Sequence, residues 1–234
     1  NNYKSIIKKT SDYVGLSKEF VQTFVDLHKI DIKESGLIDF GNPEGYNTRQ
    51  VKGWSKRYLN SKTEEISDIN FVIKWLNDNI VQSRFESLIH NDFKYDNLVL
   101  DPLSLKVISV LDWEMSTIGD PFMDLGTSLA YWIQNDDPDF IKSIHLNITS
   151  EQGNPSRGEI LKLYQNNFGN EIDNIVFYFT YGLFKIAVIV QQIYFRYKKG
   201  LTQDTRFKDL DKVVKAYGKM AKQSIQKNKI ECLF

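Results

Sequence analysis

The sequence contains very little cysteine. Cys232 is its single cysteine among 234 residues, which excludes an intramolecular disulfide and a multi-cysteine zinc site and fits a reducing compartment. The sequence also lacks a charge imbalance, because 30 Lys and Arg residues are matched by 30 Asp and Glu residues. Nothing in this balance favours nucleic acid or an anionic membrane surface as a partner. Any charged ligand must therefore be bound by a local group of side chains.

The first residues lack the apolar core of a signal peptide, so we expect a cytoplasmic protein. One apolar run, residues 175–195, approaches the length that spans a bilayer. Lys185 lies at its middle, where insertion of a charge costs about 2.5–3.5 kcal/mol, and Gln191 and Gln192 follow. We therefore predict a buried core helix there rather than a membrane span.

Apolar residues recur at helical spacing over most of the chain. In the first part they predict helices over 17–30, with Ser17 as the N-cap, and over 47–60 and 68–80. In the last part helices are predicted over 122–134, 156–168, 172–198 and 206–226.

Between these helical parts, "NLVL" and "KVISVLDW" surround the turn "DPLS" and predict a β-hairpin. With 41% hydrophobic residues the chain can bury a sizeable core. The predicted fold class is α+β, mainly helical, with polar motifs at the ends of one small hairpin.

The stretch "LIHNDFKYDN", residues 88–97, directly precedes that hairpin. Asp92 and Asn97 are separated by four residues, which is the spacing in the catalytic loop of protein kinases, and Asp112 follows the second predicted strand. Phosphoryl transfer from a nucleotide needs magnesium, which prefers hard oxygen ligands such as a carboxylate and an amide carbonyl. It also needs a carboxylate that orients the attacking hydroxyl and accepts its proton. Asn97 and Asp112 are candidates for the first task and Asp92 for the second.

Longer motifs carry a family resemblance. "LIHNDFKYDNLVL" followed by "VISVLDWEMSTIGDPFMDLG" looks like the catalytic motif of the aminoglycoside phosphotransferase and choline kinase superfamily, which are small-molecule kinases with a protein-kinase-like fold. Within it the chain most resembles the kinase-like domains associated with acyl-CoA dehydrogenases. "DFGNPEGYNTRQVKGWSKRY" and "FYFTYGLFKIAVIVQQIYFRY" support this narrower match, so that the resemblance extends over about residues 15–200.

The resemblance implies Asp92 as catalytic base and Asn97 and Asp112 as magnesium ligands. It further implies that Asp120 and Asp124 support the catalytic loop from the start of the following helix. A local interpretation remains open for this pair, because an aspartate before a proline and an acid in the first turn of a helix are each favourable by themselves.

His90, Asn91 and Glu114 lie within or next to these motifs. His90 is interpreted as a packed residue that supports the loop backbone rather than as a base. Glu114 either lies near the metal or the substrate or is a solvated acid. Asn91 departs from the motif, because many members have glycine there, although choline-kinase-like members also use asparagine.

The resemblance begins where the second lobe of such a kinase would start. No Gly-rich loop follows a strand and no strand lysine precedes the helices, although the first lobe of these kinases supplies both. We expect residues 1–234 to form the C-terminal lobe, with the N-terminal β-rich lobe absent from this chain; a natural one-lobe protein is the alternative. Its expected parts are a helical substrate-side insert (34–82), a catalytic and metal core (83–134) and C-terminal helices (150–234).

The acceptor site is expected between the insert and the later helices. Acidic residues do not cluster as a polycationic antibiotic would require, which favours a neutral or anionic hydroxylated acceptor, and the narrower resemblance suggests a hydroxyacyl-CoA. Basic residues that could meet it, or could be solvated helix faces, are Arg49, Lys52, Lys56, Arg57, Lys185 and Arg196. Lys94 is a further candidate for proximity to substrate or metal.

Taken together, the sequence predicts a small-molecule kinase that moves the γ-phosphate of ATP to a hydroxyl with magnesium, and whose isolated C-terminal lobe could be inactive. One alternative is a pseudokinase or binding module, although Asp92, Asn97 and Asp112 are all present. A second is a hydrolytic metal site around His90 and Asp92. It would need further histidines, and His28 and His145 are not in ligand-like spacing.

Overall fold

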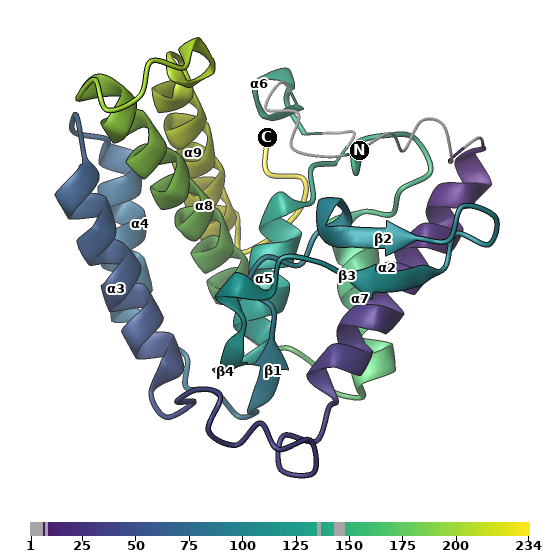
Figure 1. The fold of residues 1–234 in the computed structure, drawn as a ribbon. Helices are drawn as coiled ribbons and strands as arrows, with labels where there is room; N and C mark the ends of the chain where they lie inside the picture. The colour runs from purple at the N-terminus through teal and green to yellow at the C-terminus, as the bar shows by residue number, and fades with distance from the viewer. Residues whose placement is uncertain (1–6, 8, 135–136, 143–147) are drawn as a thin grey trace.

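Helices surround two very small sheets in the computed structural model, which describes residues 7, 9–134, 137–142 and 148–234. The helices before the sheets are α2 (Thr10–His28), α3 (Tyr46–Ser61) and α4 (Ser67–Asp78). Those after them are α5 (Pro121–Tyr131), α6 (Asp139–Lys142), α7 (Arg157–Phe168), α8 (Ile175–Lys198) and α9 (Leu210–Lys227). In Figure 1, α3 and α4 lie on the left beside α8 and α9, while α2 and α7 lie on the right. The predicted mainly helical α+β class is confirmed.

The first helix corrects one prediction. Helix α2 begins at Thr10, and Ser17, predicted as the N-cap, lies inside it. The Ser17 hydroxyl donates to the carbonyl of Val14 at 3.0 Å, one turn earlier. It therefore bonds within the helix and does not cap the helix start. The carboxylate of Asp12 instead accepts from the backbone N–H of Lys9 at 2.9 Å and satisfies a donor at the true start.

The predicted hairpin is present. Strands β2 (Leu98–Leu100) and β3 (Val107–Val110) pair antiparallel, with Leu98 opposite Val110. A second pair was not predicted: β1 (Ser87–Ile89) and β4 (Thr117–Gly119) run antiparallel on either side of the hairpin in sequence. These four strands deliver the polar loops at their ends to the same part of the molecule (Figure 1).

Helix α8 forms the centre of the core. By length and composition it could cross a membrane, but 78% of an apolar 18-residue stretch of this helix is buried inside the protein, so the prediction of a core helix is confirmed. It crosses α5 at a pair of glycines: a Cβ on Gly182 would overlap the carbonyl oxygen of Gly126, and a Cβ on Gly126 would overlap that of Tyr178. The two helices therefore approach more closely than side chains would permit.

Candidate active site

The loop between β1 and β2 contains His90, Asn91, Asp92 and Asn97, and a buried carboxylate fixes its backbone. Asp124, in the first turn of α5, is fully buried. Its Oδ2 accepts from the N–H of His90 at 2.6 Å and its Oδ1 from the N–H of Asn91 at 2.9 Å. Asp124 therefore bonds the backbone of this loop directly.

Two further buried residues stand behind Asp124. Nε2 of His28 lies 3.3 Å from Oδ2 of Asp124, and Nδ1 of His28 lies 2.6 Å from the hydroxyl of Tyr164. Burial, followed by the charges of Asp124 and Asp120, raises the pKa of Tyr164 well above its ordinary value. The tyrosine therefore remains a protonated donor, and the network joins α2 and α7 to the loop. Sequence reasoning missed this role of His28 and Tyr164, because neither residue lies in a motif.

His90 uses both of its ring nitrogens within the protein. Nε2 donates to the carbonyl of Leu111 at 2.8 Å, and Nδ1 accepts from the N–H of Asp92 at 3.3 Å, a tautomer assigned from these partners. The ring also packs against Trp113, with centroids 4.9 Å apart. His90 thus ties the loop to the end of β3, and neither nitrogen is left to bind a metal ion.

Asn91 has a left-handed backbone, with φ of 68°. This conformation strains most residues with a Cβ, while asparagine tolerates it better. Its side-chain amide donates to the carbonyl of Met115 at 3.0 Å, and its Oδ1 accepts from the hydroxyl of Tyr46 at 3.2 Å. The left-handed backbone accounts physically for glycine or asparagine at this position.

The carboxylate of Asp92 is held by two donors. Its Oδ2 accepts from Nζ of Lys94 at 2.6 Å and from Nδ2 of Asn97 at 3.0 Å, and its side chain is 15% exposed. Nδ2 of Asn97 also donates to the Asp92 carbonyl at 2.8 Å. Lys94 lies over the ring of Tyr131, 4.8 Å from its centroid. Burial and then the charge of Asp92 raise the pKa of Tyr131, so that its hydroxyl stays protonated beside this carboxylate.

The hairpin brings Asn97 and Asp112 to the same end. The N–H of Leu111 donates to the carbonyl of Asn97 at 2.8 Å, which extends the β2–β3 ladder by one residue pair. Asp112 directly follows Leu111 and so lies near Asn97. Asp112 is exposed and has a left-handed backbone, with φ of 70°. The amide nitrogen of Asn97 donates to Asp92, so the amide oxygen of Asn97 and the exposed carboxylate of Asp112 are the groups that could bind a metal ion. This donor set fits a magnesium ion that shares its coordination with phosphate oxygens.

Asp120 differs from Asp124 in its contacts. Its Oδ1 accepts from the N–H of Phe122 at 2.8 Å and caps α5, while its Oδ2 accepts from Nδ2 of Asn47 at 2.7 Å. Burial raises the pKa of Asp120, and the hydrogen bond from Asn47 opposes that rise. The contacts of Asp120 match the local interpretation: it caps the start of α5 and links this helix to α3.

The remaining candidates lie in different surroundings. Glu114 is exposed on the short turn Trp113–Met115 that follows Asp112. Arg49 is also exposed, and its guanidinium donates to the carbonyls of Glu44 and Asn42, so it supports the loop before α3. Lys185 is 1% exposed, and its Nζ donates to the backbone carbonyl of Asn91 in the loop between β1 and β2. His145 lies outside the described residues.

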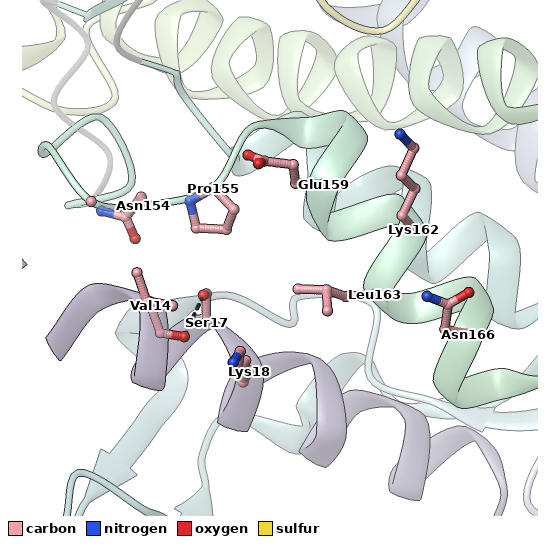
Figure 2. Close-up of a pocket in the computed structure, with 10 residues that line it drawn as sticks. Val14, Ser17, Lys18, Asn154, Pro155, Glu159, Lys162, Leu163 and Asn166 are labelled. Atoms are coloured by element: carbon pink, nitrogen blue, oxygen red, sulfur yellow. Dashed lines mark hydrogen bonds between the residues drawn. The ribbon is translucent and has the colours of Figure 1, made fainter. Parts of the chain in front are cut away.

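A pocket of about 440 Å³ lies elsewhere, between α2 and α7. Figure 2 shows its lining side chains, with the Ser17 hydroxyl bonded to Val14 on one wall and Lys162 and Leu163 on the other. It contains none of the candidate catalytic residues. Asn154 at one end connects it to the catalytic loop, because its Oδ1 accepts from the hydroxyl of Tyr95 at 3.2 Å. This pocket and the candidate catalytic residues therefore lie in separate places.

The sequence matches a known protein family and several longer proteins. Residues 12–146 match the phosphotransferase enzyme family, APH. The chain is 32% identical over 202 residues to mouse acyl-CoA dehydrogenase family member 10, covering 86% of this chain and 19% of that protein. It is 36% identical over 197 residues to family member 11 from rat, covering 82% of this chain and 24% of the relative. The chain thus spans about a fifth to a quarter of the length of these curated relatives.

Solved structures share the fold. A crystal structure of a candidate aminoglycoside phosphotransferase from Ralstonia eutropha JMP134 is 29% identical, with a TM-score of 0.83, and the match covers 94% of this chain and 67% of that one. Spectinomycin phosphotransferase APH(9)-Ia, in complex with ADP and spectinomycin, matches with a TM-score of 0.52 at 12% identity, over 91% of this chain and 66% of that one.

Proposed function

Because the chain belongs to the APH phosphotransferase family, an ATP-dependent kinase family, we propose that it transfers the γ-phosphate of ATP to a hydroxyl group of a small molecule. The observation that carries this proposal is the arrangement of one loop and one hairpin. Asp92, Asn97 and Asp112 lie together there, with Asn97 bonded to Asp92 and to the backbone next to Asp112. We further propose that residues 1–234 provide the catalytic C-terminal lobe of a kinase domain.

In this proposal Asp92 is the general base. Its carboxylate would accept the proton of the acceptor hydroxyl as the oxygen attacks the γ-phosphate. The donors Lys94 and Asn97 orient the carboxylate, and the N–H of Asp92 is fixed by His90. Because proton transfer requires hydrogen-bond distance to the hydroxyl, this orientation decides which hydroxyl can react.

Asn97 and Asp112 would hold the magnesium ion. When bound, the ion neutralises the phosphate oxygens of the nucleotide. The chain contributes to this by fixing the Asn97 amide through Asp92 and by presenting Asp112 at an exposed position. Two protein ligands suffice, because magnesium in such sites keeps water and phosphate oxygens as its other ligands.

We propose a hydroxyacyl-CoA or another small hydroxylated metabolite as the acceptor. The names of the relatives, acyl-CoA dehydrogenase family members, support an acyl-CoA compound. Helix α3 presents Lys52, Lys56 and Arg57 at exposed positions, where they could meet an anionic group. The complex of the spectinomycin phosphotransferase with ADP and its antibiotic supports a nucleotide and a small molecule as the two ligands.

The alternative is a binding module without turnover. The ion pair between Lys94 and Asp92 is the observation that favours it, because a cation paired with the carboxylate makes the carboxylate a weaker base. In the kinase proposal, the incoming hydroxyl shares or displaces this contact.

The test is phosphoryl transfer by the longest form that the reading frame encodes. Magnesium-ATP is incubated with a panel of hydroxyacyl-CoAs and small alcohols, and phosphorylated product is detected by mass spectrometry. We expect Asp92→Asn to lower turnover by about 100-fold or more while magnesium-ATP binding is retained. Asp112→Asn should instead weaken magnesium-ATP binding, measured by calorimetry.

The matched control is Asp26→Asn, which changes an exposed aspartate on α2 and should leave turnover unchanged. Undiminished turnover by Asp92→Asn would refute the base assignment. Binding of magnesium-ATP without any product across the panel, and without ATP hydrolysis, would favour the binding module.

A further inference from the structure

Lys185 is a buried lysine at the middle of the core helix α8. Its Nζ donates to the backbone carbonyl of Asn91 at 2.7 Å and lies 3.3 Å from Oδ1 of the same residue. The ring of Trp54 lies on another side, with its centroid 5.8 Å from Nζ. Because Asn91 directly precedes Asp92, the contact between Lys185 and Asn91 bears on the position of the proposed base.

Burying an ammonium group is unfavourable unless polar partners compensate. Burial lowers the pKa of Lys185 to about 8, while the charges of Asp124 and Asp92 oppose that decrease and those of Arg57 and Lys94 add to it. The carbonyl and amide oxygens of Asn91 are its direct hydrogen-bond acceptors. A leucine or methionine would fill an apolar helix core without this desolvation, so the lysine has a use that depends on its N–H groups.

The bonded carbonyl belongs to the peptide that joins Asn91 to Asp92. A peptide group is planar, so the carbonyl of Asn91 and the N–H of Asp92 move together. Lys185 holds the oxygen side of this plane at 2.7 Å, and Nδ1 of His90 holds the nitrogen side at 3.3 Å. The N–H on the other side of Asn91 is held by Asp124 at 2.9 Å.

These bonds stabilise an uncommon conformation. Asn91 has φ of 68°, and a residue with a Cβ leaves the left-handed region readily unless surrounding groups hold it there. If the peptide after Asn91 rotated, the Cα of Asp92 would move and its carboxylate would leave the position that Lys94 and Asn97 define.

We propose that Lys185 is a positioning residue for phosphoryl transfer. Its hydrogen bond to the Asn91 carbonyl fixes the Asn91–Asp92 peptide plane and so sets the direction of the Asp92 carboxylate. This inference rests on the proposed function, in which Asp92 is the base. It differs from the possibility that Lys185 contacts an anionic substrate, because the bonded groups are backbone and amide oxygens of the catalytic loop.

The experiment compares Lys185→Met with Lys198→Met in the longest encoded form. Lys198 is an exposed lysine on the last turn of the same helix and serves as the matched control. The assay is hydrolysis of magnesium-ATP, with water as the phosphoryl acceptor. Water carries no anionic group, so a lysine that only binds the substrate would not affect this reaction.

We expect Lys185→Met to lower kcat for ATP hydrolysis by about 100-fold, since a small misplacement of a catalytic group has effects of that order. The KM for magnesium-ATP should change much less than kcat, because Asp112 and the backbone of Asn97 stay in the hairpin ladder when the Asp92 carboxylate turns. Lys185→Arg, which keeps an N–H donor, should recover part of kcat. Wild-type kcat in Lys185→Met would overturn the proposal.

A second measurement is independent of turnover. Hydrogen exchange of the Asp92 amide should be faster by about tenfold in Lys185→Met and unchanged in Lys198→Met, corresponding to the loss of roughly one hydrogen bond. If Lys185→Met does not fold, Lys185→Leu, which also lacks an N–H donor, replaces it in both measurements.

The two readouts separate the two proposals. If the wild type hydrolyses no ATP and phosphorylates no acceptor, the proposed function fails, and the exchange rate of the Asp92 amide still decides whether Lys185 holds this peptide. If the exchange rate does not change in Lys185→Met, the positioning role is overturned whatever the catalytic result.

Discussion

At the scale of single residues, the candidate base depends on groups that hold its neighbour. The N–H of Asn91 is bonded to Asp124 and its carbonyl to Lys185, so two buried charged residues fix one left-handed residue. The four-residue spacing between Asp92 and Asn97 pointed to this loop. It did not point to Lys185, which lies 94 positions away from Asn91 in sequence.

The lowered pKa of Lys185 makes a prediction about stability and pH. In the unfolded chain the amine has its ordinary pKa of 10.5, and in the folded protein burial lowers it to about 8. Below pH 8 both states are protonated and the burial penalty is present in full. Between about pH 8 and 10.5 the folded protein has lost this proton while the unfolded chain retains it, so stability rises with pH in this window.

Chemical denaturation of wild type and Lys185→Met from pH 7 to 11 tests this. Relative to Lys185→Met, the free energy of unfolding of the wild type should rise by up to about 3 kcal/mol across the window. Asp92, Asp124, Arg57 and Lys94 are common to both proteins, so the difference isolates the lysine. A pH-independent difference would show that Lys185 is not desolvated as the structure indicates.

At the scale of elements, periodicity predicted the long helices, and β-forming residues on both sides of a local turn predicted the hairpin. The pair of β1 and β4 was missed. Each of these strands has three residues, and their partners are 28 to 32 positions apart, so neither has a local pattern. The start of α2 was placed too late, because a serine inside a helix resembles an N-cap in sequence.

The crossing of α5 and α8 gives a prediction at this scale. Gly182→Ala places a methyl group onto the carbonyl of Gly126, and overpacking of this kind should destabilise the fold by about 1–3 kcal/mol. Gly53→Ala is the matched control, because Gly53 is also in a helix interior but has no atom within 4 Å of the added Cβ. It should stabilise the protein by about 0.5–1 kcal/mol. Thermal denaturation of the two variants should thus show shifts of opposite sign.

At the scale of the whole molecule, Arg157 joins distant parts of the chain. It is fully buried at the start of α7, where its guanidinium pairs with Asp137 and donates to the carbonyls of Trp132 at 2.8 Å and Ile230 at 3.3 Å. One side chain thereby connects the segment after α5, the start of α7 and the segment after α9. Its five donors allow this branching, which a lysine could not reproduce.

Arg157→Met should destabilise the protein by about 3–5 kcal/mol, because it leaves Asp137 buried without its cation. The double variant Arg157→Met, Asp137→Leu should recover much of that loss. Arg84→Met, which removes an exposed ion pair with Asp173, is the control and should leave the midpoint of urea denaturation nearly unchanged. Equal effects of the buried and the exposed arginine would contradict this account.

The sequence by itself determined the helical periods, the hairpin and the candidate residues of the loop, because each of these depends on residues close together in the chain. It therefore predicted Asp92, Asn97 and Asp112 as one group, and the hairpin ladder brings the last two together. Tertiary structure alone decided which of the two aspartates bonds the loop backbone, Asp124, and which caps α5, Asp120. It also decided that Lys185 bonds to Asn91 and His28 to Asp124. These contacts depend on which helix faces pack together, and that choice is made by the whole buried core rather than by any local pattern.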